Sequence, residues 1–207
     1  MTTTMSRREA ITTISAVLAL FSLKVPIKAK SVDAVASATK SDSFTINPDA
    51  NVLITCVSFH HQNTLKIANA ISSVMNVQMI HPDHFLSVDL TKYKIIGFGS
   101  GIYSQTFHRS MLNLADKLTN VKKYKAFLFS TSAISRAYAL KHKTTDFHTP
   151  MRNKLLSKGF EILGEYNCVG WNTNSFMKFF GGMNKGKPNE DDFKNAREFA
   201  AKLFERI

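Results

Sequence analysis

The sequence predicts an α/β protein built on a parallel β-sheet with helices on both faces. Short apolar runs rich in β-branched residues alternate with helical segments five times between residue 51 and residue 207. This alternation is typical of parallel sheets whose strands are joined by helices. The first run, NVLITCVS, is apolar along almost its whole length, which indicates a strand that is covered on both faces.

The strands are expected at five apolar runs, Asn51–Ser58, Val77–Pro82, Tyr93–Gly101, Tyr124–Ser132 and Glu161–Gly170. Helices are expected from about Asn63, over 107–118, over 144–159 and over 189–207. Gly159 is placed to end the third helix, because glycine readily adopts the left-handed conformation of a C-cap. Acidic residues gather in the first turn of the last helix, where they complement its dipole.

Length and composition favour one domain, residues 46–207, preceded by a segment of different character, residues 1–45. A chain of 207 residues, 44% of them hydrophobic, can bury a substantial core. Residues 1–45 hold six of the 27 basic and three of the 15 acidic residues, so the remaining chain keeps +9 of the net charge of +12. This charge favours acidic partners or anionic membrane surfaces. We expect no nucleic-acid partner, because the basic residues are scattered and accompany no aromatic-interleaved tract.

Residues 1–45 have the order of a secretory signal. A positively charged start is followed by about 14 mostly apolar residues, 10–23, and by a stretch of small residues with the cleavage pattern AVA at 34–36. The apolar run is shorter than the roughly 20 residues needed to span a bilayer. The letters SRR at 6–8 resemble a twin-arginine export signal, so we expect a periplasmic or membrane-associated protein. An uncleaved anchor, a transit peptide and a cytoplasmic location are the alternatives.

The loop SFHHQNT, Ser58–Thr64, joins the first expected strand to the first helix. Ligands of parallel sheets lie beyond the carboxyl ends of the strands, so the loops to watch are 58–64, 99–107, 130–137 and 170–187. A helix N-terminus has free backbone N–H groups and a positive dipole end, which together favour an anion. Hydroxyl and amide side chains in the loop add donors. The loop therefore predicts a phosphate site, although Ser58 and Thr64 would also serve as ordinary helix caps.

The stretch SFHHQNTLKIA resembles the flavodoxin phosphate loop, whose usual form is Ser/Thr-x-Thr-Gly-Asn-Thr followed by a helix. The resemblance continues in GFGSGIY, FSTSA and GGMNKGKPNEDDFKNAREFA and covers about residues 50–207. It implies a flavodoxin-like three-layer sandwich, a five-stranded parallel sheet in the order 2-1-3-4-5 and a non-covalently bound FMN.

The resemblance assigns twelve residues to the cofactor and none to catalysis. The phosphate would be bound by Ser58, His60, Asn63 and Thr64. The two loops beside the isoalloxazine ring would be Ser100, Gly101, Ile102 and Tyr103 on one side and Ser130, Thr131, Ser132 and Ala133 on the other. The loop from Ser58 is one residue longer than the usual motif, Gln62 replaces its glycine, and the basic charge differs from that of the acidic flavodoxin carriers.

Aromatic residues and glycines near these loops have two interpretations each. Tyr103 is the best candidate to lie against a flavin, with a partly exposed core aromatic as the alternative; Trp171 and Tyr138 are weaker candidates. Gly97, Gly99 and Gly101 lack the full dinucleotide pattern. We expect them to let the backbone approach a flat ring, with an ordinary tight turn as the alternative.

Histidines and cysteines are not expected to form special sites. His60 and His61 follow the first strand, and His81 and His84 follow the second. These four have no recognised metal-ligand spacing, so surface histidines are expected and no metal is predicted. Cys56 and Cys168 fall three strand spacings apart in the implied sheet order, roughly 14 Å. A disulfide requires Cα atoms within about 7 Å, so two separate thiols are expected.

Three functions remain open at this level. The first is an FMN-binding electron-transfer protein with a redox partner protein or quinone, either acidic or membrane-associated. The second is a flavin-dependent oxidoreductase acting on a quinone or a protoporphyrinogen, because menaquinone-dependent protoporphyrinogen dehydrogenases are similar in the IGFGSGIY region. The third is a module that binds another phosphorylated ligand without redox chemistry.

Overall fold

The computed structural model describes residues 47, 49–119 and 124–207. The predicted signal and cleavage site lie outside these residues. Within the described part of the chain, no helix is long and apolar enough to cross a membrane.

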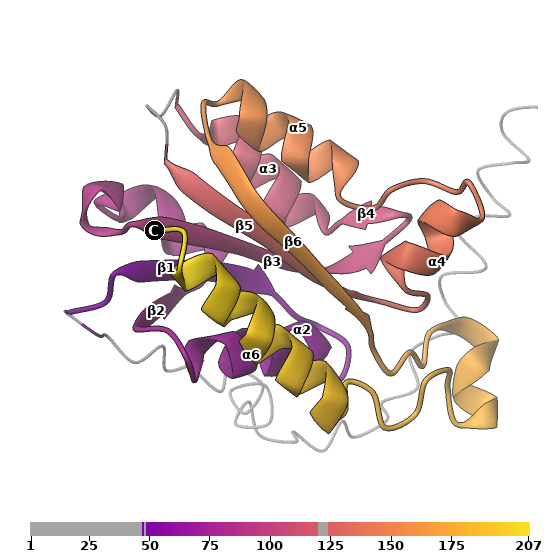
Figure 1. Cartoon of the computed structure of the whole chain (residues 1–207). Coiled ribbons are helices and arrows are strands. Elements are labelled where there is room, and N and C mark those ends of the chain that lie inside the picture. The colour runs from indigo at the N-terminus through magenta and orange to yellow at the C-terminus, as the bar shows by residue number, and fades with distance from the viewer. Residues whose placement is uncertain (1–46, 48, 120–123) are drawn as a thin grey trace, which may run out of the picture. The chain divides into compact units, whose positions relative to one another are not determined.

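The core of the fold is a parallel sheet of five strands, which confirms the predicted fold class. The strands are β1 (Val52–Val57), β2 (Val77–Ile80), β3 (Ile95–Tyr103), β5 (Lys125–Ser132) and β6 (Glu161–Val169). They are hydrogen-bonded in the order β2-β1-β3-β5-β6, all parallel (Figure 1). This is the flavodoxin-like order 2-1-3-4-5. Every residue of β1 is buried, as its continuous apolar run predicts.

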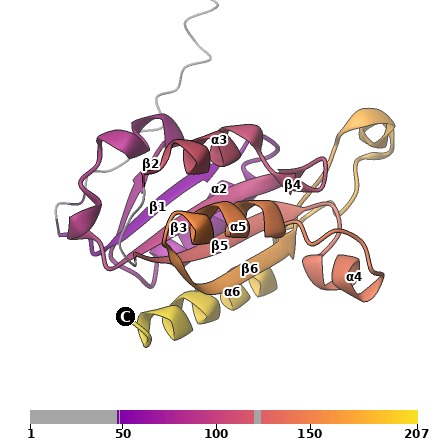
Figure 2. The ribbon, with the colours of Figure 1, turned by 90° about the horizontal axis from the view of Figure 1, so that it is seen from above.

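Helices cover both faces of this sheet. The helices α2 (Asn63–Ser72) and α6 (Glu190–Phe204) pack on one face, and α3 (Arg109–Lys117) and α5 (Thr149–Ser157) pack on the other. Figure 1 shows the first pair below the sheet and the second pair above it. Figure 2, seen from above, shows α3 and α5 lying along the strands. The three central strands β1, β3 and β5 are buried on both sides because each face has its own apolar cluster, whereas the edge strands β2 and β6 are mostly half-buried.

The structure confirms two predictions about helix ends in the C-terminal half of the chain, one at the end of α5 and one at the start of α6. Gly159 has φ 91° directly after the last turn of α5, as a C-cap glycine does. At the start of α6, the Asn189 side chain accepts from the Asp192 N–H, and the Asp192 carboxylate accepts from the Asn189 N–H. This capping box satisfies two donors, and the acidic first turn also complements the helix dipole.

The expected strict alternation of strand and helix is wrong at two places. Between β2 and β3 the chain forms two short 3-10 helices, η2 (Pro82–Ser87) and η3 (Leu90–Lys92), because the segment is short and is capped locally by His81 and Asp89. After β5 it forms a helix that was not predicted, α4 (Arg136–Lys141), capped by the Ser135 hydroxyl. A further short strand, β4 (Thr106–Phe107), pairs antiparallel with the end of β3.

Two glycines of β3 have a role other than the one expected. Gly97 and Gly99 lie opposite Phe127 and Phe129 of β5. A Cβ built on either glycine would overlap the ring of its phenylalanine neighbour. Both rings are fully buried. The prediction that these two glycines let the backbone approach a ligand ring is therefore wrong, because core aromatic side chains occupy that space.

The two cysteines are separate thiols, as the strand order requires. Cys56 lies in β1 and Cys168 in β6, with β3 and β5 between them; both are buried and neither forms a disulfide. Burial, with the charge of Asp192, raises the pKa of Cys168 to about 12. This thiol therefore stays protonated and unreactive at neutral pH.

Gly99→Ala should destabilise the fold by about 1–3 kcal/mol, because the added methyl group overpacks against the Phe129 ring. Urea unfolding followed by circular dichroism would measure this change. In the double variant Gly99→Ala with Phe129→Leu, the ring that clashes is gone, so the loss should be smaller than the sum of the two single losses. Strictly additive losses would contradict the close packing of Gly99 in β3 against Phe129 in β5.

Candidate functional site

A hollow opens at the carboxyl edge of the sheet. It contains about 420 Å³ of empty space, including its open mouth. Four chain segments form its walls: the loop after β1 with the start of α2, the end of β3, the end of β5 with the following loop, and the chain after β6. The lining residues are Ser58, Phe59, His60, Asn63, Thr64, Gly101, Ile102, Tyr103, Thr131, Ser132, Ala133, Gly170, Trp171, Asn172 and Asn174.

The loop after β1 is shaped by two residues in the left-handed conformation. His61 has φ 51° and Gln62 has φ 55°, and Gln62 occupies the N-cap position of α2 without a side-chain capping bond. The Ser58 hydroxyl instead accepts from the Leu65 N–H at 3.1 Å. The loop therefore turns sharply onto the helix axis, and the N-terminus of α2 lies beside the hollow with its positive dipole end.

Asn63 and Thr64 join this loop to the opposite walls. The Asn63 Nδ2 donates to the Trp171 carbonyl at 2.8 Å, and the hydroxyls of Thr64 and Thr131 are 2.8 Å apart. Asn63 is buried, yet its Oδ1 has no hydrogen-bond partner within the described chain. An unpaired buried oxygen in the wall of a hollow is free to accept from a ligand hydroxyl, since leaving it unpaired is costly.

An aromatic cluster forms the wall at the end of β3. The Tyr103 ring centroid is 5.9 Å from that of His60, 5.3 Å from His108 and 6.4 Å from Phe59. The same ring packs on Gly101, where a Cβ would come within 2.9 Å of it. Burial raises the pKa of the Tyr103 phenol. Tyr103 is thus a neutral, half-buried wall residue, and Phe59 beside it is 61% exposed.

Trp171 forms the wall after β6. Its indole stacks on the His61 imidazole with centroids 3.8 Å apart and planes at 15°. His61 is itself held by the Thr173 hydroxyl at 2.8 Å. On the same side, the Asn184 Nδ2 donates to the Ala133 carbonyl at 2.7 Å. The chain after β6 is therefore tied both to the loop after β1 and to the loop after β5.

The structure brings ten of the twelve sequence-predicted residues into the lining of the hollow. Ser100 and Ser130 are not among them. Both are fully buried: the Ser100 hydroxyl accepts from the His108 N–H, and the Ser130 hydroxyl pairs with His148. Their hydroxyls support the loops from beneath.

Sequence reasoning missed some lining residues and some supporting ones. Phe59, Gly170, Asn172 and Asn174 line the hollow but were not assigned. The signal that could have found them was their position in the loops 58–64 and 170–187, which the strand pattern already placed at this edge. Tyr138, a weaker candidate, lies on α4 and packs on His142 with ring centroids 4.2 Å apart, outside the lining.

Two pairs of histidines follow the strands as predicted, His60 and His61 after β1 and His81 and His84 after β2. His81 and His84 remain a pair beyond β2, with ring centroids 6.5 Å apart, while His60 and His61 contact aromatic residues of the hollow. The part of the chain that the structure describes contains no group of three or more metal-ligating side chains.

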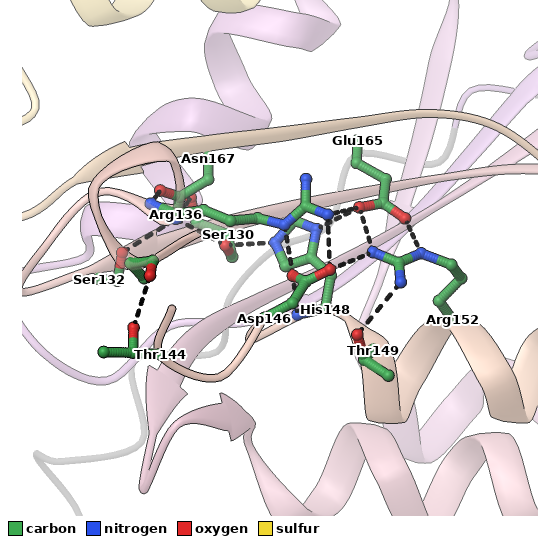
Figure 3. Close-up of polar contacts among 11 residues, drawn as sticks. Ser130, Ser132, Arg136, Thr144, Asp146, His148, Thr149, Arg152, Glu165 and Asn167 are labelled. Atoms are coloured by element: carbon green, nitrogen blue, oxygen red, sulfur yellow. Dashed lines mark hydrogen bonds and ion pairs between the residues drawn. The ribbon is translucent and has the colours of Figure 1, made fainter. Parts of the chain in front are cut away.

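A buried polar network lies beneath the loop after β5, and sequence reasoning gave no hint of it. The Ser130 hydroxyl is 2.7 Å from the His148 Nε2, and the His148 Nδ1 is 3.1 Å from Glu165 (Figure 3). Arg136 and Arg152 each contact both Asp146 and Glu165. Figure 3 shows the two guanidinium groups flanking these carboxylates.

The network contains two positive and two negative groups, so it is balanced with a neutral His148. Burial lowers the pKa of His148 below its usual 6.5. Burial favours the neutral acid of Glu165, but hydrogen bonds from Arg152 and His148 outweigh it and lower the pKa of this carboxyl to about 2. Asp146 is held ionised mainly by Arg136. In this state His148 donates from Nδ1 to Glu165 and accepts from Ser130 at Nε2.

The same network extends to the hollow. Asn167 donates from Nδ2 to the hydroxyls of Ser130 and Ser132, each at 2.9 Å, and its Oδ1 accepts from the Arg136 N–H at 2.7 Å. Ser132 lines the hollow. The position of this wall therefore depends on hydrogen bonds that lead back to His148 and Glu165.

The strand order, with helices on both faces of the sheet, is that of the flavodoxin-like fold. The structure of oxidised Flavodoxin 2 from Bacillus cereus matches with a TM-score of 0.55 and 20% identity, covering 76% of this chain and 100% of that one. A flavodoxin from the domain Archaea matches with a TM-score of 0.52 and 14% identity, covering 75% and 96%. At such identities the likeness concerns the fold.

The sequence itself has a nearer relative. Uncharacterized protein MJ0298 of Methanocaldococcus jannaschii is 44% identical over 151 residues, which cover 73% of this chain and 96% of that protein. The chain belongs to the family of this protein. No family model matches the sequence.

Glu165→Gln should lower the free energy of unfolding by about 2 kcal/mol at pH 7, because it leaves two arginines short of a charged partner that is only partly solvated. The pKa of Glu165 is lower in the folded than in the unfolded state, so its contribution is complete above about pH 4.5 and is lost as the pH falls toward 2. The difference between wild type and variant should therefore shrink over that window. Urea titrations at several pH values would measure it.

The matched control is Glu161→Gln, an exposed carboxylate on the same strand, which should change stability by less than about 0.5 kcal/mol. Equal losses for the two variants would mean that the network adds nothing beyond surface charge.

Proposed function

We propose that the hollow binds FMN without a covalent bond and that the protein transfers electrons through it. The observation that carries this proposal is the position of the hollow. It lies beyond the carboxyl ends of β1 and β3, where the chain passes from one side of β1 to the other. In flavodoxin-like sheets this switch point is where a ligand fits without displacing a strand or helix.

The phosphate end of the cofactor would lie against the loop after β1. Ser58, Asn63 and Thr64 line that part of the hollow beside the N-terminus of α2. Backbone N–H groups and the helix dipole favour an anion there. The Asn63 Oδ1 would accept from a sugar hydroxyl, which would satisfy the one buried side-chain oxygen of the lining that lacks a partner.

The ring end would lie between the two aromatic walls. Tyr103 and Phe59 line the hollow beside the end of β3, Trp171 lines it after β6, and Thr131–Ala133 line it at the end of β5. Flat aromatic side chains bury a flat ligand well and exclude water from it. Bound FMN would accept and donate one or two electrons. The chain's own groups would orient the flavin and shield it from water.

An electron carrier is favoured over an enzyme with side-chain acid or base chemistry. Within the described chain, only one serine, histidine and carboxylate are linked by two consecutive hydrogen bonds, namely Ser130, His148 and Glu165. Both Ser130 and His148 are fully buried and do not line the hollow. They cannot reach a substrate there, so they are positioning residues.

The cofactor proposal is tested first by the absorption spectrum of the purified protein and by adding FMN to colourless protein. We expect a two-banded flavin spectrum and a 1:1 complex with FMN. A protein that neither carries nor takes up FMN would favour a non-redox module that binds another phosphorylated ligand.

The phosphate position is tested by Gln62→Glu, which adds a negative charge to an exposed side chain at the start of α2. We expect about tenfold weaker FMN binding through charge repulsion, unchanged binding of riboflavin, which has no phosphate, and no loss of stability, because an acidic residue suits a helix N-terminus. Fluorescence titration with both ligands would measure this.

Asn69→Glu is the matched control, since it adds the same charge to an exposed position nearly two turns further along α2. It should leave FMN binding within about twofold, because screening reduces the repulsion at that distance. If Gln62→Glu weakened riboflavin as much as FMN, the phosphate would not lie at this loop.

A further inference from the structure

We propose that the surface around the hollow docks on an anionic lipid bilayer, with Phe179 and Phe180 inserted among the lipids. This mouth surface consists of the segments 58–64, 100–110, 130–145 and 170–188. The inference concerns the surface itself and does not require that the hollow carry a flavin.

Exposed apolar side chains gather on the mouth surface. Of the ten large hydrophobic residues that are exposed within the described chain, six belong to it, namely Phe59, Ile134, Tyr138, Leu140, Phe179 and Phe180. Phe179 and Phe180 are 77% and 81% exposed, the highest values of this set. Exposed apolar residues are normal singly, but a group of this kind marks an interaction site.

The segments that carry these residues project from one end of the fold. Phe179 and Phe180 belong to the 3-10 helix η4 (Ser175–Phe180), and Tyr138 and Leu140 belong to α4. In Figures 1 and 2, α4 and the light-orange segment between β6 and α6 both extend beyond the carboxyl ends of the strands. A flat surface approaching that end would meet these two segments first.

The charge of the mouth surface has one sign. None of the 15 acidic residues of the chain falls in its four segments. Asp146 directly follows the third segment, where its charge is paired with Arg136 and Arg152. Arg109, Lys141, Lys143, Lys178 and Lys185 are exposed, and the structure records no ion pair for them among the described residues. Such cations are attracted to anionic lipid, each by about 1 kcal/mol near the surface.

A bilayer explains this combination better than an acidic protein. Phe179 and Phe180 directly follow Lys178 in η4, and the Lys178 Nζ lies 5.1 Å from the centre of the Phe179 ring. Side chains of this kind insert their rings between lipids while the ammonium groups remain at the headgroups. A protein partner would instead require a closely complementary, mostly desolvated surface, with few lysines at its centre.

The sequence supplies an independent reason to favour a bilayer. Residues 10–23 form an apolar run of about 14 residues behind a positively charged start. Where this run is retained as the uncleaved anchor, which is one of the alternatives to a cleaved signal, it is a single weak anchor. Such an anchor and a basic apolar surface each bind membranes reversibly, and the two signals together give stable binding. The mouth surface would then be the second signal, and it would direct the hollow toward the lipid.

The test is co-sedimentation of the full chain with large vesicles, either of phosphatidylcholine alone or with about 30% phosphatidylserine. Wild type should bind the anionic vesicles more strongly than the neutral ones, and added salt should weaken this binding. Phe179→Ser with Phe180→Ser should lower the partition into anionic vesicles by about tenfold or more. Circular dichroism would verify that the variant folds.

The matched control is Leu156→Ser with Phe204→Ser, two residues exposed to 48% and 47% that lie outside the mouth surface. It should bind as wild type does. The inference is overturned if wild type does not prefer anionic vesicles, or if the Phe179 and Phe180 variant binds as strongly as the control. The measurement is made with colourless and with FMN-treated protein, so a failure of the cofactor proposal stays distinguishable from a failure of docking.

Discussion

The interlock of β3 with β5 is the constraint on which the other features depend. Gly97 and Gly99 leave gaps in the central strand, and the rings of Phe127 and Phe129 fill them. This fit favours one register of β3 against β5 on the face covered by α2 and α6. Because β1 pairs with the other side of β3 in register from Val52 to Val57, the relative height of all three strands follows from it. The loops that form the hollow leave these strands at one common edge.

The polar network around His148 fixes a second part of that edge, the loop after β5 relative to β6. Arg136 lies at the start of α4, Asp146 and His148 lie before α5, and Glu165 lies in β6. Their contacts join three elements of the chain around one balanced group of charges. Breaking one partner of such a group costs more than forming it contributes. Its role is therefore best described as fixing a geometry: the loop after β5 stays at one height relative to β6.

The residue pattern was sufficient for the strands and for the edge at which the hollow opens, and the physical reason is local; the order of the strands came from the resemblance to flavodoxins. Continuous apolar runs identify buried parallel strands, and turn and capping residues mark their carboxyl ends, so the loop after β1 could be recognised together with its helix. Pairwise contacts between distant segments could not be recognised in this way. Gly99 carries no sign of Phe129, which lies thirty positions later. The polar network combines Ser130, His148 and Glu165, and their spacing follows no helical or strand period. The short helix α4 was missed because six residues give too weak a periodic signal.

The hairpin at the end of β3 determines how the hollow meets a ligand. Ser104 and Gln105 both have positive φ, and Tyr103 pairs directly with Thr106, which is the arrangement of a tight two-residue hairpin. Tyr103 therefore belongs to a strand pair, whereas wall residues of binding sites often belong to free loops. A ligand that enters meets a wall that is already ordered, so little conformational freedom is lost on binding. At the proposed site, selectivity would therefore come from shape, because a wall held in a strand pair adapts little to a poorly fitting ligand.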